Sequence, residues 1–258
     1  MRGHDGVPLS RAPLGARDDH VHTSSPVEVK PVPRDAAGLR SRLRAAHGRV
    51  LALNPFPLPL HLVTGNHDTP EALVGGFGGT RFLGGGRLTS YVVEHAAFTV
   101  VVLDSWVSGS PGGGLGSGQV AWLERALAER PGAPALVCLH HPPVPVGIPF
   151  LDAMGLADGP ALAAVVAAHP RVVRVLAGHV HRPVTAPFAG STVAVAPSTY
   201  RQSGLVLREG VPGYPDEPPA FLLHVRPGAP AGAAWVTHTV PTSAPGVSRR
   251  VRSARPSC

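Results

Sequence analysis

The pattern of hydrophobic and polar positions changes near Pro59. Before that residue, Pro, Arg, Asp and His are mixed without a sustained period of two, and only residues 35–48 (DAAGLRSRLRAAHG) indicate a weak helix. After it, short apolar runs alternate with amphipathic segments. We therefore predict an irregular segment over residues 1–55, one folded domain over residues 56–240, and a disordered basic tail over residues 241–258.

Short apolar runs in the folded domain predict its strands. Residues 90–105 (SYVVEHAAFTVVVLDS) indicate a hairpin, because two apolar runs flank a short break. The other apolar runs predict strands within residues 60–65, 134–141, 171–181, 191–196, 221–225 and 234–240.

Two amphipathic segments between these runs predict helices. Residues 117–130 indicate a helix with Ser117 as its cap, and residues 158–170 indicate a helix that starts near Pro160. The apolar face of the first helix consists of Val120, Leu123 and Leu127. Since near-continuous apolar strands that alternate with such helices form a sheet covered on both faces, we predict the α/β class.

Composition and charge narrow the possible partners. The chain of 258 residues is 43% hydrophobic, which suffices for one core, and its 31 glycines and 30 prolines predict many loops. The net charge of +7 comes almost entirely from arginine, concentrated at the two ends without a basic stripe. We therefore expect no nucleic-acid partner, and we leave the oligomeric state open.

The sequence also indicates where the protein resides. No apolar run approaches the roughly 20 residues that a membrane span needs, and the first residues lack the apolar stretch of a signal peptide. The two cysteines, Cys138 and Cys258, have neither the spacing of a disulfide framework nor that of a metal site. We expect a cytoplasmic protein without a membrane partner.

Polar side chains with metal-binding chemistry follow three of the predicted strands. These groups are Asn66-His67-Asp68, His140-His141 and the pair His179 and His181. Because the carboxyl ends of neighbouring strands in α/β sheets meet at one crevice, we expect the groups to lie close together.

A single histidine at a strand end is more often a structural residue than a ligand. We interpret four histidines in that way, namely His95, His169, His224 and His238. His179 and His181 differ, because positions i and i+2 just past Gly178 can present two imidazoles to one centre.

The motifs GNHD (residues 65–68), HHPP (140–143) and GHVH (178–181) resemble, in order and spacing, those of the calcineurin-like metallophosphoesterases. The stretches IPFLDAMGL and APSTYRQ look most like the class III cyclic-nucleotide phosphodiesterase branch, which includes glycerophosphodiesterase-type enzymes. The resemblance covers about residues 59–240. It implies a four-layer αββα sandwich and a hydrolase with two divalent ions of the Mn, Fe or Zn class.

The resemblance also implies a set of metal ligands. Asn66, His140 and His179 would hold one ion, and His181 would help to hold the other. Paired cations offset the negative charge of a phosphodiester and lower the pKa of a bound water. The implied activity is hydrolysis of a small phosphodiester by metal-activated hydroxide, with a 3',5'-cyclic nucleotide as one candidate substrate.

Four further residues receive roles from the same resemblance. His67 would face the phosphate as an acid or charge stabiliser, and Asp68 would orient His67. We expect His141 and Tyr200 to contact the substrate.

Two upstream motifs of the family are missing in their expected setting. These are an Asp-x-His at the end of a first strand and a Gly-Asp whose aspartate bridges both ions. Asp18-Asp19-His20 matches the first motif but follows no predicted strand, and no Gly-Asp pair precedes Gly65. One interpretation is a shifted reading frame or mis-called start over residues 1–55. The alternative is a site reduced to one ion or none, in a non-catalytic remnant that binds metal or phosphate weakly.

Overall fold

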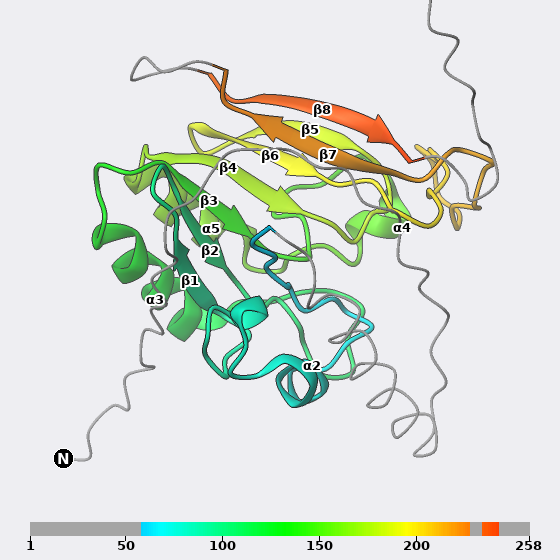
Figure 1. Ribbon diagram of the computed structural model, residues 1–258. Coiled ribbons are helices and arrows are strands. Elements are labelled where there is room, and N and C mark those ends of the chain that lie inside the picture. The colour runs from blue at the N-terminus through cyan, green and yellow to red at the C-terminus, as the bar shows by residue number, and fades with distance from the viewer. Residues whose placement is uncertain (1–57, 228–233, 243–258) are drawn as a thin grey trace, which may run out of the picture.

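The computed structural model describes residues 58–227 and 234–242 (Figure 1). The helix predicted at residues 35–48, the Asp18-Asp19-His20 match and the tail beyond residue 242 lie outside these residues. None of the helices in the described ranges is both long and apolar enough to span a bilayer.

A six-stranded mixed sheet forms the centre of the fold (Figure 1). Its strand order is β1-β2-β3-β4-β6-β5, in which β2, β3, β4 and β6 are mutually parallel and the two edge strands run antiparallel to their neighbours. The strands are β1 (Tyr91–Glu94), β2 (Thr99–Val102), β3 (Ala135–Cys138), β4 (Val172–Ala177), β5 (Val184–Phe188) and β6 (Ser191–Val195). This parallel-rich sheet with its helices confirms the predicted α/β class.

Helices α3 (Gly116–Ala128) and α5 (Gly159–Ala168) cover one face of the sheet (Figure 1). Their apolar residues join those of β2, β3 and β4 in one buried cluster, in which Leu123 and Leu127 are fully buried and Val120 packs at the edge. The predicted apolar face of the first helix is thus confirmed. The short helix α4 (Pro149–Asp152) lies in the loop between β3 and α5.

Several smaller elements cover the other face of the sheet. They are α2 (Pro70–Phe77), the 3₁₀ turn η1 (Arg81–Leu83) and a two-stranded antiparallel sheet of β7 (Ala220–Val225) and β8 (Val236–Pro241). Phe77, Phe82 and Trp235 pack with Val100 and Leu136 in a second apolar cluster. The sheet is therefore covered on both faces, as the near-continuous apolar strands predicted.

Three details differ from the sequence prediction. Residues 60–65 form no strand in the described part of the chain: their apolar side chains pack on the second cluster, but Leu62 makes only one backbone bond, to Phe82 (3.1 Å). Strand β5 was not predicted, because Pro187 interrupts its apolar pattern; an edge strand tolerates proline. Ser117 is not a cap, since α3 begins at Gly116.

Candidate metal centre

The parallel strands bring the predicted polar groups to one edge of the sheet. His140 follows β3, and His179 and His181 follow β4. Asn66 reaches the same edge from the turn after residues 60–65, and its Oδ1 lies 3.0 Å from Nε2 of His140. The convergence expected from strand direction is therefore present for these side chains.

The turn that carries Asn66 and His67 does not use them as helix caps. Asp68 closes the turn, because its Oδ2 accepts a hydrogen bond from the Gly65 amide (2.9 Å) while its own amide donates to the Gly65 carbonyl (3.0 Å). Thr69 caps α2 by accepting from the Ala72 amide. Asn66 and His67 are left for another role. The expected bond from Asp68 to His67 stays a prediction.

Two possible metal-ligand atoms lie close to Nε2 of His140, which is a third. Besides Asn66 Oδ1 at 3.0 Å, Nδ1 of His179 lies 3.3 Å away. A single imidazole nitrogen cannot donate to the amide oxygen and accept from the second ring in the same tautomer. Ligands that share one ion at a metal–nitrogen distance of about 2.1 Å lie about 2.9–3.4 Å apart. The spacing suits a shared cation better than two hydrogen bonds.

The other ring nitrogen of His179 takes no part in this contact. Nε2 is buried and has no hydrogen-bond partner within the described ranges, but a ring that binds the shared ion through Nδ1 cannot also bind it through Nε2. The backbone of His179 (φ 68°) and that of His181 (φ 53°) both adopt the left-handed region, which L residues occupy only when the surroundings hold them there. The residues present therefore fit a divalent ion.

Burial keeps the imidazole rings of the cluster neutral. Together with the neighbouring imidazoles, burial lowers the pKa of His140 to about 2 and that of His179 to about 4. Burial likewise lowers the pKa of His181, helped by the charges of His67 and Arg201. Neutral imidazole is the form that coordinates metals, so these rings need no deprotonation at neutral pH.

His141 has a different environment from its neighbour His140. It is fully buried, its Nδ1 lies 2.8 Å from the Ser105 hydroxyl, and its Nε2 lies 3.1 Å from the Pro111 carbonyl. Nε2–H therefore donates to Pro111, and Nδ1 accepts from Ser105. Although its ring atoms lie within 4.8 Å of those of His140 and His179, both of its nitrogens already have partners. The sequence analysis did not find Ser105, which follows β2 at the same edge.

His67 and Tyr200, two other predicted site residues, are exposed. The charge of His67 contributes to the lowered pKa of His140, His179 and His181. Tyr200 is 54% exposed in the segment after β6. Their contacts with substrate stay predictions.

The candidate ion site contains no carboxylate in the part of the chain that the structure describes. The possible histidine ligands that lie close together there are His140, His141 and His179, and both ring nitrogens of His141 already have partners. Two cations a few ångströms apart need an anionic bridge to offset their repulsion. The described residues therefore provide ligands for an ion but no carboxylate to bridge it to a second one.

Two of the histidines interpreted as structural make packing or hydrogen-bond contacts in the structure. His95 stacks on Phe98 and touches His61, and Nδ1 of His224 lies 2.9 Å from the Thr237 hydroxyl. Neither ring lies in the metal cluster. The interpretation is confirmed for these two residues.

Comparison with known proteins identifies the family. Residues 33–183 match the calcineurin-like phosphoesterase family, so the chain belongs to that family. It is 29% identical over 194 residues to the glycerophosphodiester phosphodiesterase GpdQ of Enterobacter lignolyticus, a match that covers 72% of this chain and 66% of the relative. Calcineurin-like phosphoesterases use divalent metals, in agreement with the histidine cluster.

Two further relatives carry related names. A probable glycerophosphodiester phosphodiesterase GpdQ of Arcobacter nitrofigilis is 32% identical, over 65% of this chain and 62% of the relative. The 3',5'-cyclic adenosine monophosphate phosphodiesterase CpdA of Escherichia coli is 33% identical, over 56% of this chain and 51% of the relative. The chain thus spans less than two thirds of the length of these relatives.

Proposed function

We propose that this chain is a metal-dependent phosphodiesterase that hydrolyses a small phosphodiester at the carboxyl edge of its sheet. The names of its relatives supply the candidate substrates, which are glycerophosphodiesters and 3',5'-cyclic nucleotides. The observation that carries the proposal is the contact of Asn66 Oδ1 and His179 Nδ1 with one atom, Nε2 of His140.

In this proposal Asn66, His140 and His179 hold a divalent ion of the Mn, Fe or Zn class, and His181 contributes to a second position. A bound ion supplies positive charge to the phosphodiester and acidifies the attacking water. His67, exposed beside the cluster, protonates the leaving oxygen or stabilises its charge.

The experiment is a metal titration of hydrolysis with purified full-length chain. Protein stripped with a chelator is given Mn²⁺, Zn²⁺ or Mg²⁺ and assayed on bis(p-nitrophenyl) phosphate. We expect Mn²⁺-stimulated turnover that His179→Ala and His181→Ala abolish, and a loss of about 10²–10⁴-fold in kcat for His67→Ala. His238→Ala, on the exposed side of β8, is the matched control and keeps full activity. Absence of turnover with all three ions contradicts the proposal.

A second candidate is a non-catalytic member of the family that binds one ion weakly. The absence of a carboxylate from the three-histidine group, in the part of the chain that the structure describes, favours it. Calorimetric titration with Mn²⁺ separates the two candidates. Two tight ions support the enzyme, and one weak ion without turnover supports the binding protein.

A further inference from the structure

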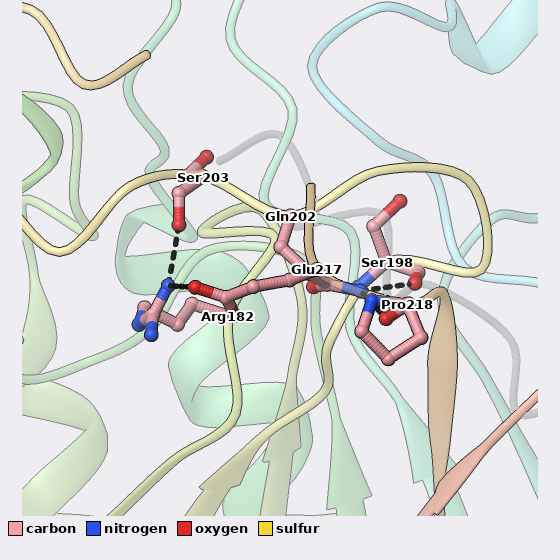
Figure 2. Close-up of polar contacts among 6 residues, drawn as sticks. All are labelled: Arg182, Ser198, Gln202, Ser203, Glu217 and Pro218. Carbon is pink, nitrogen blue, oxygen red and sulfur yellow. Dashed lines mark hydrogen bonds and ion pairs between the residues drawn. The ribbon is translucent and has the colours of Figure 1, made fainter. Parts of the chain in front are cut away.

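The segment that follows β6 forms a rigid turn at the same edge as the histidines. Gln202 is 2% exposed, its Oε1 accepts from the Ser198 amide (3.1 Å), and its Nε2 donates to the carbonyls of Ser198 (2.8 Å) and Pro218 (3.1 Å), as Figure 2 shows. The Ser198 hydroxyl in turn accepts from the amides of Tyr200 (3.1 Å) and Arg201 (3.3 Å). The backbone of Arg201 is therefore held inside a hydrogen-bonded turn.

This turn is tied directly to the GHVH motif. The Ser203 amide donates to the His181 carbonyl (2.9 Å). Arg182, which follows His181, donates from Nη1 to the Ser203 carbonyl (2.7 Å) and pairs with Glu217 (3.1 Å; Figure 2). Arg201 lies two residues before Ser203, and its charge acts on the His181 ring. The turn thus holds the backbone of Arg201 two residues from its hydrogen bond to the GHVH motif.

The side chain of Arg201 is oriented by aromatic rings rather than by an acid. Its guanidinium carbon lies 3.7 Å from the centroid of the Tyr214 ring and 5.5 Å from that of Tyr200. Arg201 is exposed, and within residues 58–227 and 234–242 no carboxylate pairs with it. Stacking on a ring face leaves the N–H edge of a guanidinium available, and that planar edge matches the oxygens of a phosphate.

We propose that Arg201 binds the non-bridging oxygens of the phosphodiester that occupies the metal cluster, and that Tyr214 is the positioning residue that orients it. This inference rests on the proposed function for the location of the substrate. It adds a specificity residue contributed by the segment after β6. In this proposal the phosphodiester charge pairs with the Arg201 guanidinium. Because the turn already orders Arg201, its side chain loses little conformational freedom when the phosphodiester binds.

Binding of diethyl phosphate, measured by calorimetry on the Mn²⁺-loaded full chain, tests the inference without requiring turnover. Arg201→Ala is expected to weaken binding about tenfold, as loss of a hydrogen bond to a charged group does. Arg201→Lys, which keeps a point charge but not the planar edge, is expected to restore part of the affinity. The matched control is Arg208→Ala, an exposed arginine of the same segment, which is expected to bind as the wild type does.

Two Tyr214 variants test the positioning role. Tyr214→Phe keeps the ring face and is expected to retain wild-type binding, whereas Tyr214→Leu removes the ring and is expected to weaken binding several-fold. In the hydrolysis assay, KM for bis(p-nitrophenyl) phosphate is expected to rise about tenfold in Arg201→Ala, with a much smaller change in kcat.

The outcomes separate this inference from the proposed function. Wild-type binding of diethyl phosphate that is lost in Arg201→Ala supports the inference even if no turnover is found, a result that overturns only the catalytic proposal. Turnover with equal binding by Arg201→Ala and Arg208→Ala overturns only the inference. A defect of Arg201→Ala restricted to aryl substrates also overturns it, because it indicates stacking on the substrate instead of phosphate binding. Failure of the wild type to bind diethyl phosphate overturns it as well.

Discussion

The Ser105 hydroxyl lies 2.8 Å from Nδ1 of His141, although 36 residues separate them in the chain. The same hydroxyl accepts from the His141 amide (3.3 Å), so one serine holds both the ring and the backbone of this residue. The opposite ring nitrogen donates to the Pro111 carbonyl. His141 therefore fixes the chain next to His140, and it connects the loops after β2 and β3 at the edge that carries the candidate ion site.

Replacing Gly113 by alanine is predicted to disturb this arrangement. A Cβ atom at that position would lie 2.3 Å from Nδ1 of His141. The His141 ring is buried and hydrogen-bonded, so it cannot move away to relieve this clash. We expect Gly113→Ala to lower the free energy of unfolding by about 1–3 kcal/mol, measured by urea denaturation of the metal-free protein.

The control for that substitution lies in helix α3. A Cβ atom at Gly118 would meet no atom within 4 Å, and a helical alanine is favoured over glycine. Gly118→Ala is therefore expected to raise the free energy of unfolding by about 0.5–1 kcal/mol. Equal stabilities of the two variants would contradict the close packing of Gly113 on His141.

Asp158 is predicted to stabilise the start of α3 from a distant part of the chain. Its carboxylate accepts from the Leu115 amide (2.8 Å) and the Gly116 amide (2.7 Å). We expect Asp158→Ala to lower the free energy of unfolding by about 1–2 kcal/mol, because two amides and the positive end of the helix dipole lose their anion. Ser117→Ala, the control, is expected to change it by less than about 0.5 kcal/mol. A larger effect of Ser117 in urea denaturation would reverse the assignment.

The same helix shows why the sequence predicts elements better than their ends. The apolar spacing of α3 is local, so Leu123 and Leu127 were identified correctly. Its capping group comes from Asp158, 43 residues beyond Leu115, and no local pattern reveals that contact. Residues 60–65 show the converse: an apolar run predicts burial, which is observed, but strand pairing depends on a partner that the run does not specify.

The candidate site also contains features that the sequence predicted and features that it did not. The groups after the strands were predicted because strand direction places them at one edge, and the contacts of His140 with Asn66 and His179 agree with that reasoning. The separate environment of His141 could not be predicted, since the adjacent His140 has the same residue type and only contacts with Ser105 and Pro111 distinguish them. Arg201 was missed because the contacts that join its turn to His181 and Pro218, which are distant in the chain, are not visible in the local sequence.

His61 is predicted to make the protein less stable at acidic pH. Burial, with a smaller contribution from the neighbouring His95, lowers the pKa of this ring from 6.5 to about 4. Since the unfolded chain takes up the proton first, the contribution of His61 to stability is complete above pH 6.5 and is lost as the pH falls toward about 4. We expect the free energy of unfolding of the metal-free protein to decrease over this range.

His61→Leu is the variant that isolates this contribution. Its free energy of unfolding is expected to decrease less steeply between pH 7 and pH 4 than that of the wild type, because the titrating ring is gone. His238→Leu, at an exposed position, should retain the wild-type slope. Parallel slopes for His61→Leu and the wild type in urea denaturation would show that another group causes the loss.

Gln202→Glu is predicted to destabilise the turn that carries Arg201 in a pH-dependent manner. The side-chain nitrogen of Gln202 donates to the carbonyls of Ser198 and Pro218, and a carboxylate would place an acceptor against both. We expect a loss of about 2–3 kcal/mol in the free energy of unfolding at pH 7. Gln202→Met, which has no charge, is the control.

Acidification distinguishes charge from lost packing at this position. The same carbonyls raise the pKa of the introduced carboxyl, so at pH 4 the protonated acid can donate one bond and recover part of the loss, relative to wild type at the same pH. Gln202→Met has no such group, and its deficit should stay constant. If both variants show the same deficit at pH 7 and pH 4, the two carbonyl contacts do not hold the turn, and the ordering of Arg201 must come from its stacking on Tyr214 alone.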